Sequence, residues 1–159
     1  MPAETTNRGG AAVGFLDDLT ALDRTSVRAL RLWCAGPQGQ ARLWCELSNQ
    51  LGAKRGKEAL KAFETVVSVC MANARRPLMR HHANCNCLGA DEACFAHLIA
   101  ASAEGDREDA MMFAMLMASP DVAPVLVSLA EQFGTTVRRA TTALPNFPKP
   151  THSAAQHLQ

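Results

Sequence analysis

The residues of this 159-residue chain best suited to chemistry lie in one short segment, 80–97, which holds three of the six cysteines and three of the five histidines. Thiolate sulfur and imidazole nitrogen are ligands that zinc prefers, usually four of them in a tetrahedron. The candidate ligands are Cys85, Cys87, Cys94, His81, His82 and His97. Only one residue separates Cys85 from Cys87, so both sulfurs can converge where the chain curls. The segment predicts a metal centre, most simply a zinc site with three cysteines and one histidine.

A predicted helix over 91–103 adds two ligands from a regular element. Asp91 is its expected N-cap, which places Cys94 in the first turn, where the helix dipole stabilises a thiolate. His97 follows three residues later on the same face. His81 and His82 offer alternative ligands from the preceding loop. The residues between 77 and 90 carry no helical or strand pattern, so we expect a bound metal to order them.

Two other interpretations of the cluster remain open. An iron–sulfur cluster would use Cys85, Cys87 and Cys94, with Cys70 as an alternative fourth thiolate. Cys70 also lies on a helical apolar stripe, where a buried core residue is expected. A thiol-based redox sensor would use the cysteines without metal.

Several common enzyme motifs are absent from the sequence. It contains neither a glycine-rich nucleotide-binding motif, nor a His-Glu-x-x-His zinc motif, nor the signature of the zinc deaminases. Glu92 could act as a general base beside a metal, but a carboxylate is also favoured in the first turn of a helix. We therefore expect a regulatory or interaction module that binds metal and is not an enzyme, with a zinc-dependent hydrolase as the third hypothesis.

The composition predicts an all-α protein. Alanine and leucine dominate, tyrosine is absent, and strand-forming β-branched residues are scarce. Apolar residues at helical spacing predict a compact bundle of five or six helices within 14–140, with the Cys/His loop at 77–97. We expect a flexible arm over 1–13 and a proline-containing tail over 141–159. The expected helices cover 15–35, 40–51, 57–74, 91–103, 106–119 and 121–140.

Charge is balanced overall, at a formal +1, but unevenly distributed. Seven basic and two acidic residues fall within Lys54–Arg80, and six acidic and one basic residue within Asp91–Asp109. The basic region could bind nucleic acid, or it could pair with the acidic region of a second copy in a homo-oligomer. A protein partner is the other expectation. Neither a membrane span nor a secretion signal is recognisable, so we expect a cytoplasmic protein with reduced thiols.

Overall fold

The computed structural model describes residues 8–142, and the predicted tail over 141–159 lies almost wholly outside them. Six α-helices make up most of this part, which confirms the all-α bundle. They are α1 (Ala21–Cys34), α2 (Pro37–Leu51), α3 (Ala53–Ala72), α4 (Ala90–Glu104), α5 (Arg107–Met117) and α6 (Ala123–Thr142). Two short 3₁₀ turns, at Arg8–Gly10 and Leu16–Asp18, precede α1.

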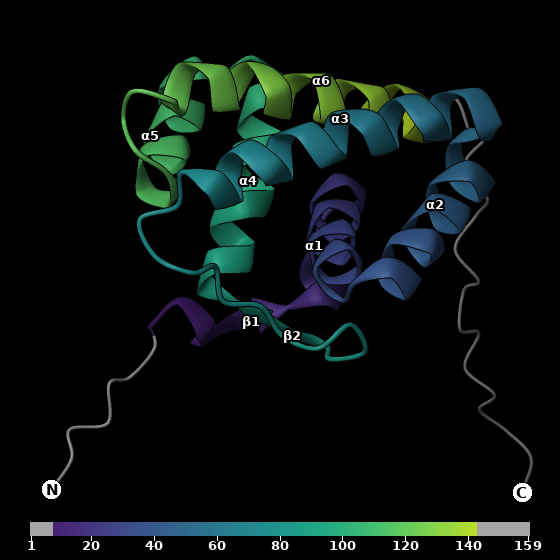
Figure 1. Cartoon of the computed structure of the whole chain (residues 1–159), viewed down its shortest axis with the longest axis horizontal. Coiled ribbons are helices and arrows are strands. Elements are labelled where there is room, and N and C mark those ends of the chain that lie inside the picture. Colours follow the sequence, from purple (N-terminus) through teal and green to yellow (C-terminus); the bar gives the residue numbers. More distant parts are fainter. Residues whose placement is uncertain (1–7, 143–159) are drawn as a thin grey trace, which may run out of the picture.

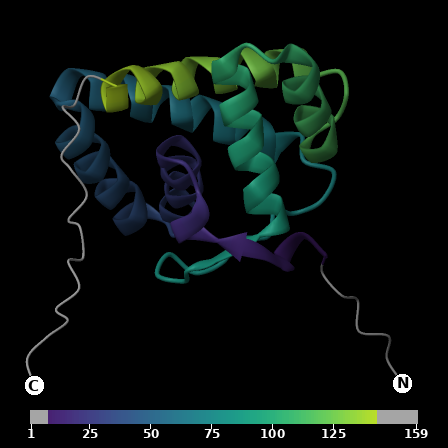
Figure 2. The same ribbon diagram turned by 180° about the vertical axis from the view of Figure 1, so that it is seen from behind.

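The long helices α3 and α6 lie side by side along one face of the molecule (Figure 1). Figure 2, seen from behind, shows α1 and α4 beneath this layer. Helix α2 packs on α3, and α5 packs on both α4 and α6. The arrangement encloses a core because each long helix repeats apolar residues on its inner face.

Phe63 of α3 lies at the centre of this core and is fully buried. Its ring makes edge-to-face contacts with Phe133 of α6 and Phe95 of α4, at centroid distances of 5.1 and 6.0 Å. Trp33 of α1 contacts it at 6.1 Å. Such aromatic pairs add stabilisation beyond their buried area, so four helices are joined through one side chain.

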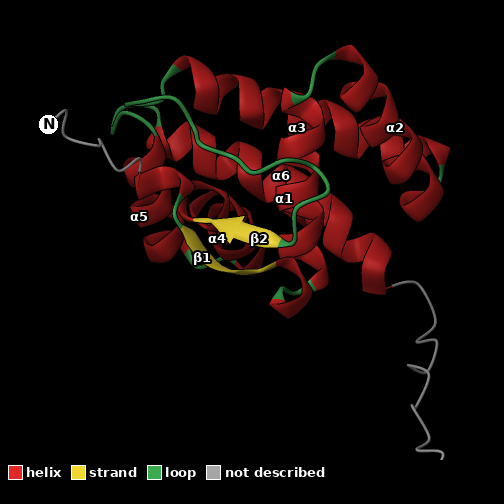
Figure 3. Ribbon diagram, turned by 90° about the horizontal axis from the view of Figure 1, so that it is seen from below, coloured by secondary structure: helices red, strands yellow, loops and turns green. Residues whose placement is uncertain are grey.

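A small antiparallel sheet, which the sequence analysis missed, lies across the end of the bundle opposite α3 and α6 (Figure 3). Strand β1 (Ala12–Phe15) pairs with β2 (Cys87–Gly89), and Phe15 lies opposite Cys87. Residues 8–13 of the predicted arm are therefore part of the fold, while 1–7 lie outside the described residues. Each strand is too short to carry an alternating pattern, which is why both escaped detection.

The helix boundaries differ from the predicted ones mainly at their starts. The first predicted helix begins six residues later, at Ala21, because Thr20 caps α1 by accepting the amide of Asp23. Helix α2 begins three residues earlier, because Pro37 occupies its first turn, a favoured position for proline. Helix α3 begins four residues earlier, directly after Gly52, whose φ of 83° separates it from α2.

Candidate functional site

Two of the six cysteines, Cys85 and Cys87, lie in the segment 77–89, named here the cysteine loop, which ends in β2 and leads into α4. At its centre is Arg31 of α1, a buried arginine whose five N–H groups all have acceptors. Its Nε and Nη2 donate to the carboxylate of Glu92 at 2.6 and 2.8 Å. The remaining N–H groups donate to the carbonyls of His82, Cys85 and Cys87, at 3.2, 2.6 and 2.5 Å.

Glu92, in the first turn of α4, is equally well satisfied and fully buried. Besides the two bonds from Arg31, its oxygens accept the backbone amides of His81 and Gly89, each at 2.9 Å. The amide of Gly89 is that of the N-cap residue, so Glu92 completes half of a capping box. The ion pair and its five backbone bonds, named here the Arg31–Glu92 clamp, fix both ends of the segment 81–89.

Asp91 holds the earlier part of the cysteine loop. Its carboxylate accepts two bonds from Arg76, at 2.7 and 2.8 Å, and the amide of Met79 at 2.8 Å. The sequence analysis predicted Asp91 as the helix cap, but the structure places Gly89 there, with Asp91 and Glu92 inside the first turn. Protein groups thus supply the loop contacts that we had expected from a metal.

The pKa values of both carboxylates are lowered from their ordinary values. Burial alone would raise the pKa of Glu92, but the Arg31 guanidinium and the two amides outweigh it, so the pKa is lowered. Burial would also raise the pKa of Asp91. The hydrogen bonds from Arg76 and from the Met79 amide outweigh this effect, so the pKa of Asp91 is lowered as well. A carboxylate so fully occupied is poorly placed to accept a proton from substrate, which disfavours Glu92 as a general base.

Cys85 and Cys87 are the two predicted ligands that the loop brings together. The backbone amide of Cys87 donates to Sγ of Cys85 at 3.4 Å, and both residues are partly exposed. A hydrogen bond between the two thiols raises the pKa of Cys87, because the neutral thiol is the form that donates. The pair is therefore a vicinal dithiol that small reactants can reach.

Cys94 of α4 borders a separate cavity of about 360 Å³, which Arg75, Arg76 and Met117 also help to line. Burial and the nearby Asp91 carboxylate raise the pKa of its thiol, although Arg76 opposes them. The expected stabilisation of a thiolate by the helix N-terminus is thus outweighed.

Of the other predicted ligands, His81 and His82 lie in the cysteine loop, whereas His97 and Cys70 lie in helices outside it. His97 is exposed and stacks on Phe113 of α5, with ring centroids 5.3 Å apart. The His81 ring packs on Gly89, and its Nε2 is buried with no hydrogen-bond partner within residues 8–142. His82 is exposed and bonds through its carbonyl. Cys70 is fully buried in the core, and burial raises its pKa to about 11.

Taken together, the described residues contain no group of three or more His, Cys, Asp or Glu side chains placed to hold a metal ion. The closed set of Cys85, Cys87, Cys94 and a histidine is not assembled in this conformation. The structure does assemble the two thiols of Cys85 and Cys87.

The basic region Lys54–Arg80 is divided by the structure. Lys54, Arg55 and Lys57 are exposed in the first turns of α3, whereas Arg76 and Arg80 follow its far end. A helix of 20 residues is about 30 Å long, so these charges form two separate groups. Arg76 pairs with Asp91, and Arg80 donates to the carbonyl of Cys34 at 3.2 Å.

Sequence reasoning missed Arg31, although a signal was present. Arg31 lies four residues after Val27 and next to Leu30, within the stripe of α1 that faces the core. A charged residue at a core position requires a partner of opposite charge. The acidic pair Asp91-Glu92, at the start of the predicted helix 91–103, was the available partner for Arg31.

Comparison with known proteins identifies no relative: no protein-family model, curated protein or solved structure matches the chain. Among the helices in residues 8–142, none has the length and apolar character required to cross a membrane.

Proposed function

We propose that this chain is a thiol-based regulatory protein of the cytoplasm, in which Cys85 and Cys87 interconvert between dithiol and disulfide. The observation that carries the proposal is the contact between the Cys87 amide and Cys85 Sγ at 3.4 Å, in a loop that presents both residues to solvent. A thiol-based sensor was one of the two alternatives to a zinc site in the sequence analysis, beside an iron–sulfur cluster. The geometry favours it because a dithiol requires only the two groups that are assembled.

The reaction needs an oxidant, and a low-molecular-weight disulfide such as oxidised glutathione is sufficient. The Cys85 thiolate attacks one sulfur of this disulfide, whose S–S bond breaks and releases one glutathione thiolate. Cys87, losing its proton, then attacks Cys85 Sγ in the mixed disulfide and releases the second glutathione. Two protein thiols are oxidised, and the two protons end on two reduced glutathione molecules. Cys85 is assigned the first attack because its hydrogen bond with Cys87 raises the pKa of Cys87 and so disfavours the Cys87 thiolate.

Oxidation has a direct route to the rest of the fold. Arg31 holds the carbonyls of the same two cysteines, at 2.6 and 2.5 Å. Closing a disulfide between residues two apart imposes specific sulfur and Cβ geometry on the intervening backbone. These carbonyls then move relative to Arg31, and the change reaches α1 and α4 through the Arg31–Glu92 clamp. Such a change in packing is the kind of event that a regulatory partner can detect.

A redox titration tests this function. The full chain is equilibrated in mixtures of reduced and oxidised glutathione, alkylated, and digested for mass spectrometry. We expect Cys85 and Cys87 to be oxidised together with one midpoint, and Cys87→Ser to leave a glutathione adduct on Cys85. Cys45→Ser, which removes an exposed cysteine outside the loop, is the matched control. Independent glutathione adducts on Cys85 and Cys87, without an internal disulfide, would overturn the proposal.

A zinc site built on the same two thiolates is the second candidate. It is favoured by the tight turn in which the amide of Cys85 donates to the carbonyl of His82 at 2.9 Å, since this turn keeps the His82 side chain within the same short loop. Metal analysis after incubation with zinc separates the candidates. Retention of one equivalent that is lost in Cys85→Ser and in His82→Ala, but not in Cys94→Ser, would favour zinc over the dithiol.

A further inference from the structure

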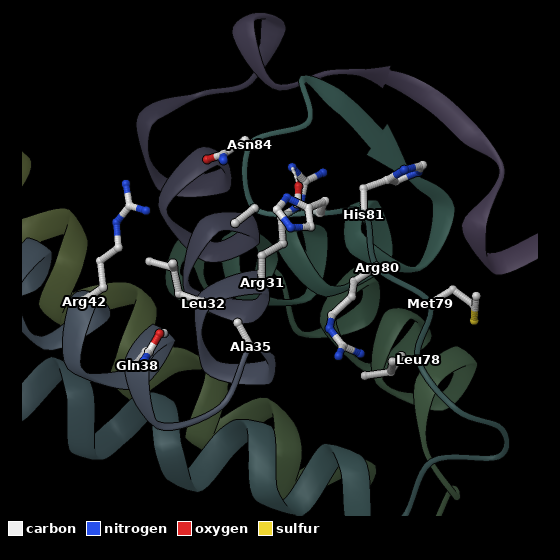
Figure 4. A pocket seen from close by; sticks show the side chains of 13 residues that line it. Arg31, Leu32, Ala35, Gln38, Arg42, Leu78, Met79, Arg80, His81 and Asn84 are labelled. Carbon is white, nitrogen blue, oxygen red and sulfur yellow. Dashed lines mark hydrogen bonds between the residues drawn. The ribbon is translucent and has the colours of Figure 1, made fainter.

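A cavity of about 730 Å³ lies between the junction of α1 and α2 and the first part of the cysteine loop (Figure 4). Its volume falls in the range of small-molecule sites. Figure 4 shows Arg42 of α2 and Arg80 of the loop on opposite sides, with Leu32 and Ala35 between them. We propose that this cavity binds a small organic anion, with a phosphate or carboxylate group and an apolar body.

The charge of the cavity wall selects for an anion. Arg42, Arg80 and His82 all line it, and none of its lining residues is acidic. The carboxylate nearest to Arg42 in the described part of the chain is Glu46, whose oxygens already take two bonds from Arg28, at 2.5 and 2.6 Å. Arg42 adds a single bond to Glu46 at 3.1 Å and remains about half exposed. Its guanidinium therefore keeps donors for a ligand.

Arg80 is similarly available. It is exposed and donates one bond, from Nη2 to the carbonyl of Cys34 at 3.2 Å. This bond orients the side chain and leaves the other guanidinium N–H groups for a ligand. Arg31 also borders the cavity, but all its N–H donors are used in the Arg31–Glu92 clamp. It therefore forms part of the cavity wall without donating hydrogen bonds to a ligand.

The amino end of α2 forms another part of the wall. Gln38 and Gly39 line the cavity and belong to the first turn, where Gly36 provides no side-chain cap. First-turn amides have no acceptor within their own helix, and the helix dipole is positive there. Gly39 packs so closely on α1 that an added Cβ would lie 2.0 Å from the carbonyl oxygen of Leu32. This packing joins the end of α1 to the start of α2 at the cavity.

The apolar part of the wall selects for the body of the ligand. Leu32, Ala35, Leu78 and Met79 contribute aliphatic and thioether surface to the same cavity. An inorganic anion would leave this surface in contact with water, whereas an organic anion would cover it and gain hydrophobic stabilisation. The combination of apolar surface and few polar groups is typical of small-molecule sites.

Calorimetric titration of the full chain with four probes tests the proposal: 1-naphthyl phosphate, 1-naphthoate, 1-naphthol and inorganic phosphate. We expect at least one naphthyl anion to bind at least tenfold more tightly than both neutral 1-naphthol and inorganic phosphate. The stronger of the two naphthyl anions identifies the head group. No binding of either anion at millimolar concentration, or equal binding of 1-naphthol, would overturn the proposal.

Variants locate the site. Arg42→Gln and Arg80→Gln should each weaken binding of the naphthyl anion about tenfold, as expected for loss of a charge-assisted hydrogen bond. Arg55→Gln, which changes an exposed arginine of α3 outside the cavity, is the matched control. Ala35→Trp, at an exposed lining position, should fill the cavity and abolish binding without unfolding the chain. Unchanged affinity in the double Arg42→Gln, Arg80→Gln variant would place any binding elsewhere and contradict the assignment.

Discussion

Removal of one partner of the Arg31–Glu92 clamp gives the largest effect that the structure predicts. In Glu92→Gln the side chain keeps its shape, but one oxygen becomes an amide nitrogen that faces donors from Arg31 and the backbone. Arg31, whose side chain is only 1% exposed, is then a buried charge without a counter-charge. Breaking a buried pair in this way costs about 3–5 kcal/mol. For a domain of this size, that lowers the melting temperature by about 10–20 °C.

The double variant Arg31→Met, Glu92→Met distinguishes a clamp from a simple ion pair. Apolar residues often replace a buried ion pair without loss of stability. Here the double variant also removes the partners of three carbonyls and two amides. We therefore expect it to be about as unstable as Glu92→Gln, with faster amide hydrogen exchange confined mainly to 81–89.

Denaturant unfolding and hydrogen exchange followed by mass spectrometry measure these effects. Glu46→Gln is the control, because it breaks the bidentate but partly exposed Arg28–Glu46 pair, for which we expect a loss of about 1 kcal/mol or less. Recovery of wild-type stability in the double variant would refute the backbone role of the clamp. So would a loss in Glu92→Gln no larger than that in Glu46→Gln.

Three further predictions concern acid stability, thiol reactivity and helix packing. The pKa values of Asp91 and Glu92 are lower in the folded state than their ordinary values of 3.8 and 4.5. The two carboxylates therefore stabilise the fold above these ordinary pKa values, and this stabilisation is lost as the pH falls through the folded-state pKa values. Urea titrations at pH 3–6 should show this acid slope, and Glu92→Gln should have a shallower one. With its pKa raised to about 11, Cys70 should resist iodoacetamide at pH 8 in the native protein while Cys45 reacts; equal labelling rates would contradict its burial. Gly39→Ala should destabilise the fold by about 1–3 kcal/mol, since the added Cβ would lie 2.0 Å from the Leu32 carbonyl oxygen. The control Asn49→Ala, on the exposed face of α2, should be nearly neutral. Similar melting temperatures for the two variants would be inconsistent with this packing.

The helices were predictable because their signals are local. Apolar residues at helical spacing, Pro37, Gly52 and Gly105 mark the elements along the chain, and the six expected helices are present within residues 8–142. The strands were not predictable, since β1 and β2 have four and three residues and pair over more than 70 positions of sequence. A pairing between such distant short segments leaves no local pattern.

The candidate site was predictable only in part. The cluster of cysteines and histidines drew attention to this segment, and in the structure the Cys87 amide lies 3.4 Å from Cys85 Sγ. The sequence could not reveal that Cys94, His97 and Cys70 lie apart from this pair, because the direction of each side chain depends on tertiary packing. We had expected a metal to order residues 77–90. The role of Arg31 in ordering them was not foreseen, because its partners lie 51–61 residues away in the sequence.

The most direct test of the thiol switch is the NMR signal of the Arg31 side chain in the two redox states. A buried Nε–H group that donates to Glu92 at 2.6 Å should give a resolved, slowly exchanging signal in the reduced protein. After oxidation with glutathione disulfide, verified by mass spectrometry, we expect this signal and the amides of 81–89 to shift, while those of α3 and α6 stay in place. A Cys85–Cys87 disulfide that leaves the Arg31 signal unchanged would contradict the proposed coupling of the thiols to the fold.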